Sequence, residues 1–163
     1  MKKKIIAISG LIFFDQLVKI IIDAFFMDKR FKLGNIIGFH PFLNKTQMSV
    51  FNRELSLGLS MTALSVINIL CIGVIFAYHL YMKKISSERN LKNADRMLLF
   101  FLPASVCSLI DKIFWGGSLD FIVFAGQISD LKDIYLIIGA FFLVMWFIAA
   151  CIEDIRKRAA EKN

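Results

Sequence analysis

The sequence predicts an all-α membrane protein: four transmembrane helices, with a small extracytoplasmic β-rich segment between the first two. Two observations lead to this fold class. Hydrophobic residues make up 58% of the 163-residue chain, above the roughly 45–50% of an average soluble domain. They are concentrated in four runs, each long enough to cross a hydrocarbon core of about 30 Å. We therefore expect a single integral membrane domain over residues 1–163.

The predicted spans lie at about 5–27, 57–82, 97–115 and 133–151. Residues 28–56 and 116–132 connect them on one side of the membrane. The first connecting segment alternates apolar and polar residues between glycine and proline turns, which predicts a few short strands. The second follows a Gly-Gly break, and its residues 118–128 are apolar enough to rest on the bilayer surface.

Lysine and arginine are distributed unevenly between the two sides of the membrane. The N-terminus, the loop 83–96 and the C-terminal tail together carry more of them than the two connecting segments do. The positive-inside rule therefore predicts that both termini are cytoplasmic. The net charge of +7 comes from residues that flank the spans and not from a separate basic domain, so no nucleic-acid partner is expected.

The three cysteines all lie in apolar runs and none has metal-ligand spacing to another. We expect them to be small buried hydrophobic residues, with no metal site and no redox role.

The second span contains one amide side chain, that of Asn68. We expect it to donate a hydrogen bond to a neighbouring helix.

The first span is interrupted by charge. Asp15, Lys19 and Asp23 follow one another at intervals of four residues, close to one stripe of a helix. Lipid could not satisfy these side chains, so the stripe must face other helices or water. Two interpretations remain open, an internal ion pair that locks the helices together and a scaffold for an active site.

A second group of charges lies between residues 107 and 139, where two apolar runs meet water. It consists of Asp111, Lys112, Asp120, Asp130, Lys132 and Asp133. The predicted orientation puts this group in the outer leaflet, together with Asp15 and Lys19. Charge at that depth is costly and its usual explanation is function, so the sequence predicts one polar site there.

Two carboxylates held close together in such a setting share a proton. The ionised carboxylate can activate a water molecule, and the protonated one can donate to a carbonyl oxygen. This chemistry needs neither a metal nor a cofactor, and the zinc-protease pattern His-Glu-x-x-His is absent from the sequence. The alternative at this point is structural, because Asp130 or Asp133 could simply cap the fourth span.

Six short motifs, in this order along the chain, resemble those of the lipoprotein signal peptidases (signal peptidase II), the intramembrane aspartyl peptidases of bacteria. They are Phe14-Asp15-Gln16 with Lys19, Phe42-Leu43-Asn44, the stretch from Asn52 to Gly58, Ser108 with Asp111-Lys112, Leu119-Asp120-Phe121-Ile122, and Ser129-Asp130-Leu131-Lys132-Asp133. Together they extend over nearly the whole chain.

The resemblance implies that Asp120 and Asp133 are the catalytic pair and that Asp111 belongs to a supporting charge pair. It also implies a set of supporting and substrate-binding residues, namely Asp15, Lys19, Asn44, Asn52, Ser108, Asp111, Lys112 and Asp130. The implied substrate is a diacylglyceryl-modified prolipoprotein, cut just before its lipidated cysteine in the bacterial cytoplasmic (inner) membrane. Membrane lipid is the other partner, and a monomer is sufficient for chemistry at one site.

Several residues depart from the family pattern. Ser108 and Asp130 replace asparagines, Lys112 replaces an arginine, Glu54 replaces a glycine and Lys132 replaces a small residue. A lysine cannot form the bidentate fork that arginine makes with a carboxylate. If Lys132 points inward it favours ionised carboxylates, whereas Asp130 acts in the opposite direction. A catalytically inactive paralogue that binds lipoprotein or lipid is therefore the alternative function, and a small transporter subunit is a third.

Overall fold

The structure is a computed structural model that describes residues 2–34, 36–45 and 57–160. Asn52 and Glu54, which the sequence analysis singled out, lie outside the described residues. The described elements are α1 (Lys2–Phe25), β1 (Phe31–Leu33), β2 (Ile37–Asn44), α3 (Met61–Ile85), α4 (Glu88–Ile110), the π-helix η1 (Asp111–Trp115), β3 (Ser118–Phe124), β4 (Gln127–Ser129) and α5 (Leu131–Ala160).

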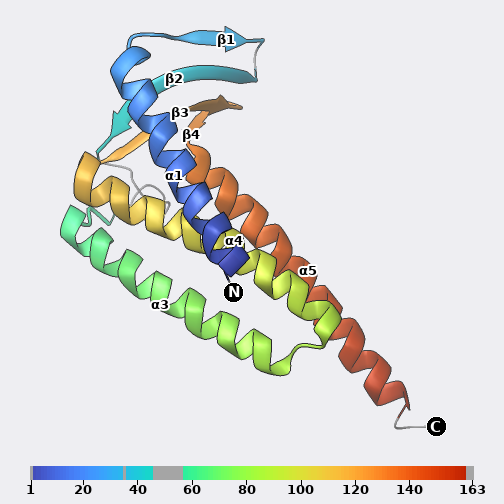
Figure 1. Cartoon of the computed structure of the whole chain (residues 1–163). Coiled ribbons are helices and arrows are strands. Elements are labelled where there is room, and N and C mark those ends of the chain that lie inside the picture. Colours follow the sequence, from blue (N-terminus) through green and yellow to red (C-terminus); the bar gives the residue numbers. More distant parts are fainter. Residues whose placement is uncertain (1, 35, 46–56, 161–163) are drawn as a thin grey trace.

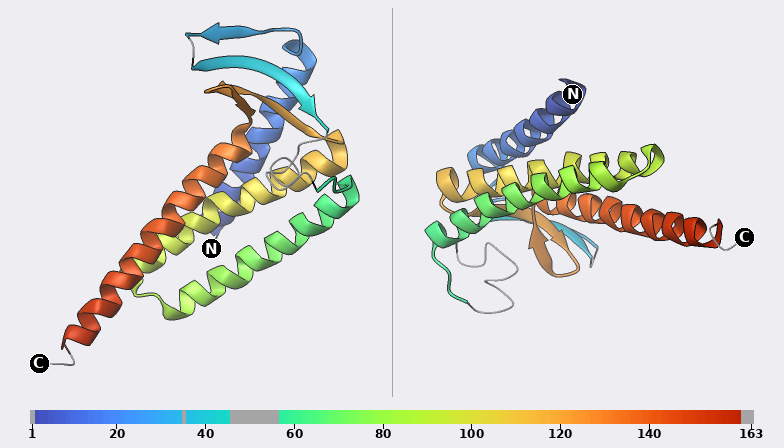
Figure 2. Two further views of the ribbon diagram at one scale, coloured as in Figure 1. Left: turned by 180° about the vertical axis from the view of Figure 1, so that it is seen from behind. Right: turned by 90° about the horizontal axis from the view of Figure 1, so that it is seen from below.

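Within the described chain, four helical segments are long and apolar enough to cross a membrane, as predicted. They are α1, α3, α4 continued by η1, and α5. The central helix is α4, because α1, α3 and α5 all pack against it. Figures 1 and 2 show a small sheet at one end of the helices, with both chain termini directed toward the other end.

The outer surface of the helices is apolar. Ile6, Phe13 and Ile137 are each at least 65% exposed, which suits contact with lipid tails. The expectation that all cysteines are buried is wrong for two of them. Cys71 and Cys151 lie on the exposed surface and only Cys107 is buried. Lipid tails are as apolar as the protein interior, so facing lipid costs such a residue little.

The sheet is formed by two separate parts of the chain. Its antiparallel strands lie in the order β1-β2-β3-β4, so the segment after α1 pairs with the segment before α5. Phe42 pairs with Asp120, and Asn44 pairs with Ser118. The predicted strands between the first two helices are confirmed by β1 and β2.

The second connecting segment differs from expectation. Residues 118–128 were expected to rest on the bilayer surface, but β3 and β4 occupy most of this range. Their backbone donors and acceptors pair with β2 and with each other, which an isolated surface segment could not achieve. Aromatic and β-branched residues from Phe121 to Phe124 favour the extended form.

The helix ends also differ from the predicted spans. α4 begins at Glu88, well before residue 97, because the Ser87 hydroxyl accepts a hydrogen bond from Asn90 N at 3.3 Å and caps the helix. α3 begins only at Met61, where Ser60 provides the same kind of cap. α5 continues to Ala160 through the charged tail. Capping residues and helix propensity determine where these helices begin and end, and hydropathy alone does not predict those positions.

The junction between α4 and β3 is unusual. The α-helix becomes a π-helix at Asp111, and Gly116 then ends it with a left-handed backbone, φ 60°. Such π segments are often found at functional sites, because they turn side chains away from the regular helical spacing. Asp111 and Lys112 are both buried in this segment.

Two contacts hold the helices at close range. A Cβ atom on Gly139 would approach the Phe101 ring to 2.3 Å, so glycine is required where α5 crosses α4. The predicted hydrogen bond from the second span is confirmed, since Asn68 Nδ2 donates to the Ser105 carbonyl at 3.0 Å. The apolar core has one cluster around Met82 and Trp146 and another under the sheet around Leu119.

Candidate active site

The predicted polar site contains a cluster of completely buried charges. Asp15 and Lys19 lie one turn apart on α1, and neither is exposed to solvent. Lys19 Nζ lies 3.1 Å from Asp15 Oδ2, 2.6 Å from Asp111 Oδ2 and 2.7 Å from Asp130 Oδ2. A single ammonium group therefore joins α1 to η1 and to the residue that precedes α5.

Lys132 provides a second cation on the other side of the same two carboxylates. Its Nζ lies 2.9 Å from Asp111 Oδ2 and also forms an ion pair with Asp130 Oδ2. Asp111 and Asp130 thus each accept from both Lys19 and Lys132. Positive and negative groups therefore alternate in the cluster. A buried charge is tolerated only when it is paired and hydrogen-bonded, and this arrangement provides both. Burial on its own raises the pKa of Asp130, but Lys132 and Lys19 outweigh it and hold that pKa below the ordinary value.

Asp23, the third charge of the predicted stripe, is exposed and lies outside this cluster. Eight residues along an α-helix correspond to about 80° of rotation, which is enough to leave the stripe shared by Asp15 and Lys19. Gln16 takes part instead. Its Nε2 donates to Asp15 Oδ2 at 3.0 Å and to Asp111 Oδ1 at 3.3 Å.

Asp120 lies beside this cluster, in the middle of β3. Ser118 Oγ donates to Asp120 Oδ1 at 2.6 Å, and Asn44 Nδ2 donates to Asp120 Oδ2 at 3.2 Å. Burial raises the pKa of Asp120 above its ordinary value, although Lys132 and the Ser118 hydroxyl act in the opposite direction. Ser118 was not predicted as a site residue. The available signal was its position two residues before Asp120, which puts both side chains on one face of a strand.

Asp130 and Asp133 form a reciprocal cap at the start of α5. Asp130 Oδ1 accepts from Asp133 N at 3.3 Å, and Asp133 Oδ2 accepts from Asp130 N at 3.3 Å. This is the arrangement of a capping box. The structural alternative considered for these two aspartates is therefore present, but it uses only one oxygen of Asp133. No residue in the described ranges forms a hydrogen bond with Asp133 Oδ1.

Lys112 has a different environment from the other two lysines of the site. Its Nζ donates to Ser108 O at 3.1 Å and to Ser108 Oγ at 2.6 Å. No ion pair to Lys112 is formed by the part of the chain that the structure describes. The charge pairs of Asp111 are thus made with Lys19 and Lys132, and its sequence neighbour is turned toward Ser108.

Asp120 and Asp133 line one groove of about 840 Å³. It is bounded by α3, α4, η1, α5 and the sheet, and its walls are mainly apolar. Asn44, Ser108, Lys112, Ser118 and Lys132 contribute the polar part of its lining near the two aspartates. Most of the predicted site residues are thus brought to the same groove or to the buried cluster beside it.

Ser129 and Lys132 have the Ser-x-x-Lys spacing of some serine hydrolases. The structure separates their functions, because Ser129 Oγ donates to the Ile122 carbonyl at 3.4 Å. Lys132 instead contacts Ser118, Asp111 and Asp130. In addition, no group of three or more potential metal ligands occurs among the residues described.

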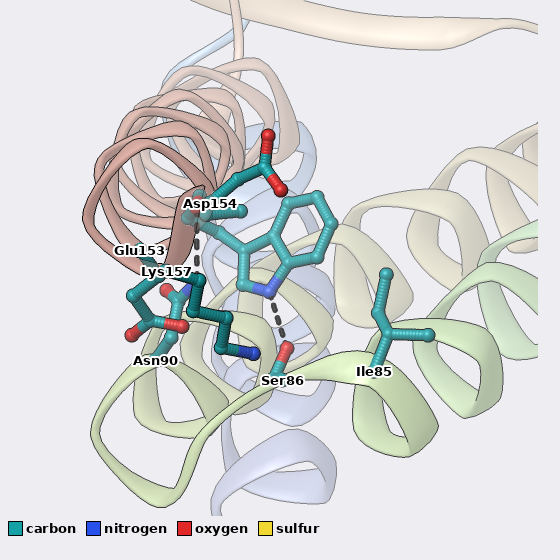
Figure 3. Close-up of a pocket in the computed structure, with 8 residues that line it drawn as sticks. Ile85, Ser86, Asn90, Glu153, Asp154 and Lys157 are labelled. Carbon is teal, nitrogen blue, oxygen red and sulfur yellow. Dashed lines mark hydrogen bonds between the residues drawn. The ribbon is translucent and has the colours of Figure 1, made fainter. Parts of the chain in front are cut away.

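A second cavity, of about 250 Å³, lies at the opposite end of the helices (Figure 3). The Trp146 indole there donates to Ser86 Oγ at 2.6 Å, and Asn90 Nδ2 donates to the Trp146 carbonyl at 3.1 Å. None of the predicted site residues lines this cavity. These contacts join the α3–α4 turn to α5, which is a structural task.

The sequence profile of the family described as "Signal peptidase (SPase) II" matches residues 7–149. The chain belongs to the signal peptidase II family. This membership supports a role as a lipoprotein signal peptidase of the aspartic class, and with the four helices it identifies a multi-pass membrane protein. No curated protein sequence matches the chain significantly.

Two solved structures share this fold. One is described as a bacterial membrane enzyme determined by the in meso method at 2.3 Å; it has a TM-score of 0.70 and 18% identity, over 91% of this chain and 89% of that chain. The other, described in the same words at 1.9 Å, has a TM-score of 0.69 and 18% identity, over 89% of this chain and 92% of that chain. At such identity the likeness establishes the fold alone.

Proposed function

We propose that this signal peptidase II family member is an intramembrane aspartic endopeptidase with Asp120 and Asp133 as its catalytic pair. Its proposed substrate is a diacylglyceryl-modified prolipoprotein, cut just before the lipidated cysteine. One observation carries the proposal: two aspartates from different elements line the same largely apolar groove. A structural cap explains one oxygen of Asp133, but it gives no reason for Asp120 to face that groove.

The reaction follows from the two protonation states of the pair. The ionised carboxylate takes a proton from water, and the hydroxide attacks the carbonyl carbon of the scissile peptide bond. The protonated carboxylic acid donates to the carbonyl oxygen, which becomes a hydroxyl in the tetrahedral intermediate. When the C–N bond breaks, a proton passes to the cysteine nitrogen, which leaves as an amine. The signal peptide keeps the new carboxylate.

The apolar wall of the groove suits a substrate embedded in lipid. Leu64, Ile67, Cys71, Val74 and Ile75 face it from α3 and follow one another at about one-turn spacing. Such a stripe would pack against a signal-peptide helix or against acyl chains. Asn68 and Ser105 also line the groove, and Asn68 donates to the Ser105 carbonyl. The charged lining residues are Lys112, Asp120, Lys132 and Asp133, and the scissile peptide bond would be placed beside the two aspartates.

The orientation of the site agrees with this substrate. The positive-inside rule would put both termini in the cytoplasm and the sheet on the outer face of the bacterial inner membrane. Asp120, in β3, would then meet lipoprotein precursors after their export. All the proposed catalytic groups come from one chain, so a monomer would be sufficient.

The test is cleavage of a lipidated precursor peptide by purified protein in detergent or lipid. Asp120→Asn and Asp133→Asn each keep the side-chain shape but remove the acid–base function, so each should lower kcat/KM by about 10²–10⁴-fold. Asp23→Asn is the matched control, because Asp23 is exposed on α1. Full activity of either Asp120→Asn or Asp133→Asn would end the proposal.

The alternative function is non-catalytic binding of lipoprotein or lipid on the same fold. It is favoured by the presence of Lys132, where the family pattern has a small residue, and by the use of Asp133 in a helix cap. The same assay separates the two functions. A binding protein would hold the lipidated precursor in stoichiometric amounts and release it uncut.

A further inference from the structure

The position of Lys132 determines the direction of the hydrogen bonds around Asp120. An ammonium group has three N–H donors and accepts none. Lys132 Nζ has three close oxygen partners: Ser118 Oγ at 2.5 Å, Asp111 Oδ2 at 2.9 Å and Asp130 Oδ2. The Ser118 oxygen must therefore accept a hydrogen bond from Lys132.

A serine hydroxyl has only one proton to donate. Ser118 Oγ lies 2.6 Å from Asp120 Oδ1 but 3.5 Å from Asp130 Oδ2, so the proton is directed to Asp120. Asn44 Nδ2 donates to the other oxygen, Asp120 Oδ2, at 3.2 Å. Both oxygens of Asp120 thus accept a hydrogen bond, and bonds donated to a carboxylate favour its ionised form.

Asp133 is placed differently. Its Oδ2 accepts one long bond from Asp130 N at 3.3 Å, and Oδ1 is without a hydrogen-bond donor among the residues that the structure describes. Two neighbouring carboxylates in a buried setting hold one proton between them. The pattern of donors leaves Asp133 Oδ1 as the position for it.

We propose that Lys132, acting through the Ser118 hydroxyl, is a positioning residue that determines the roles of the pair. Asp120 is kept ionised as the general base, and Asp133 carries the shared proton as the general acid. This inference rests on the proposed function and adds the assignment of roles. It gives a function to a departure from the family pattern, because a small residue at position 132 would leave the Ser118 proton free to point elsewhere.

Other charged groups surround this relay, and several elements contribute them. They are Asp15 and Lys19 from α1, Asp111 and Lys112 from η1, Asp130 before α5, and Asp133 in its first turn. Lys19, Lys132, Asp111 and Asp130 alternate in sign and balance one another. The direct contact to Asp120 is made by Ser118, so a change at Ser118 tests the relay without removing a charge.

The experiment measures kcat/KM for a lipidated precursor against pH. Activity requires ionised Asp120, so it falls on the acidic side as that carboxylate takes up a proton. Ser118→Ala removes a hydrogen bond to the ionised form and should move the acidic midpoint upward by about one to two pH units. Ser118→Thr keeps a hydroxyl and should restore the wild-type midpoint. Ser129→Ala is the matched control, since the Ser129 hydroxyl donates to the Ile122 carbonyl and forms no bond with Asp120 in the part of the chain described.

Removing Lys132 alone would leave Asp111 and Asp130 short of a cation, so the second variant is the charge-balanced Asp130→Asn/Lys132→Ala. It should also move the midpoint upward, because Lys132 acts on Asp120 more strongly than Asp130 does. An unchanged acidic midpoint in both Ser118→Ala and this double variant overturns the assignment of roles. That result leaves the proposed function intact, which fails only if Asp120→Asn or Asp133→Asn remains active.

Discussion

The two ends of the molecule use polar side chains in different ways. At the sheet end, Lys19 and Lys132 form ion pairs with aspartates that are completely or almost completely buried. At the other end, Asp95 forms an ion pair with Lys4 and a hydrogen-bond contact with His79, but its side chain is 25% exposed and that of Lys4 is 52% exposed. Only the sheet end therefore bears the full cost of taking charge out of water.

The cost of buried charge distinguishes the sheet end as the functional end of the molecule. The exposed pair at Asp95 can exchange its partner for water, and its loss changes little. The buried cluster has no such freedom, so its charges are kept only where the surrounding contacts compensate them. It also lies directly beside the groove that Asp120 and Asp133 line.

The largest effect is expected for the central cation. Lys19→Met would leave buried Asp15 without its cation and would leave Asp111 and Asp130 with Lys132 alone, so it should cost about 3–5 kcal/mol of stability. Lys4→Met at the other end should cost only about 0–1 kcal/mol. The measurement is thermal or denaturant unfolding of both variants in the same detergent. Equal losses would show that burial does not distinguish the two ends.

A smaller effect is expected at the cavity of Figure 3. Trp146→Phe keeps most of the ring contact but removes the hydrogen bond to Ser86 Oγ, which should cost about 1 kcal/mol. Cleavage of a lipidated precursor should keep its wild-type kcat/KM, because this cavity is remote from the catalytic pair. A loss of activity larger than the loss of folded protein would show that the two ends are coupled.

The smallest effect has the opposite sign. Burial raises the pKa of Asp120, so ionisation of this carboxylate destabilises the folded protein as the pH rises through that pKa. Asp120→Asn removes this cost, and the variant should be slightly more stable than the wild type at neutral pH. At acidic pH, where Asp120 is protonated in both folded and unfolded chains, the difference should vanish. Unfolding curves at several pH values measure it, and a variant less stable at every pH would contradict it.

The sequence alone determined the four membrane helices and the inward position of Asp15 and Lys19. Both follow from one strong constraint, because hydrocarbon satisfies neither backbone polar groups nor charge. It also determined that strands follow the first helix. The family motifs added the proposed catalytic roles of Asp120 and Asp133, which spacing alone could not assign.

Only the tertiary structure decided how the charges are partnered. Lys19 and Asp111 are 92 residues apart, and Asn44 and Asp120 are 76 apart. Contacts of this range depend on how the helices cross and how β2 and β3 align, and no local pattern records either. The inward position of Lys132 and its bond to Ser118 likewise depend on how the helices and strands pack. Hydrophobicity determines the depth of a residue in the membrane, whereas helix and strand packing determines which side chain it pairs with.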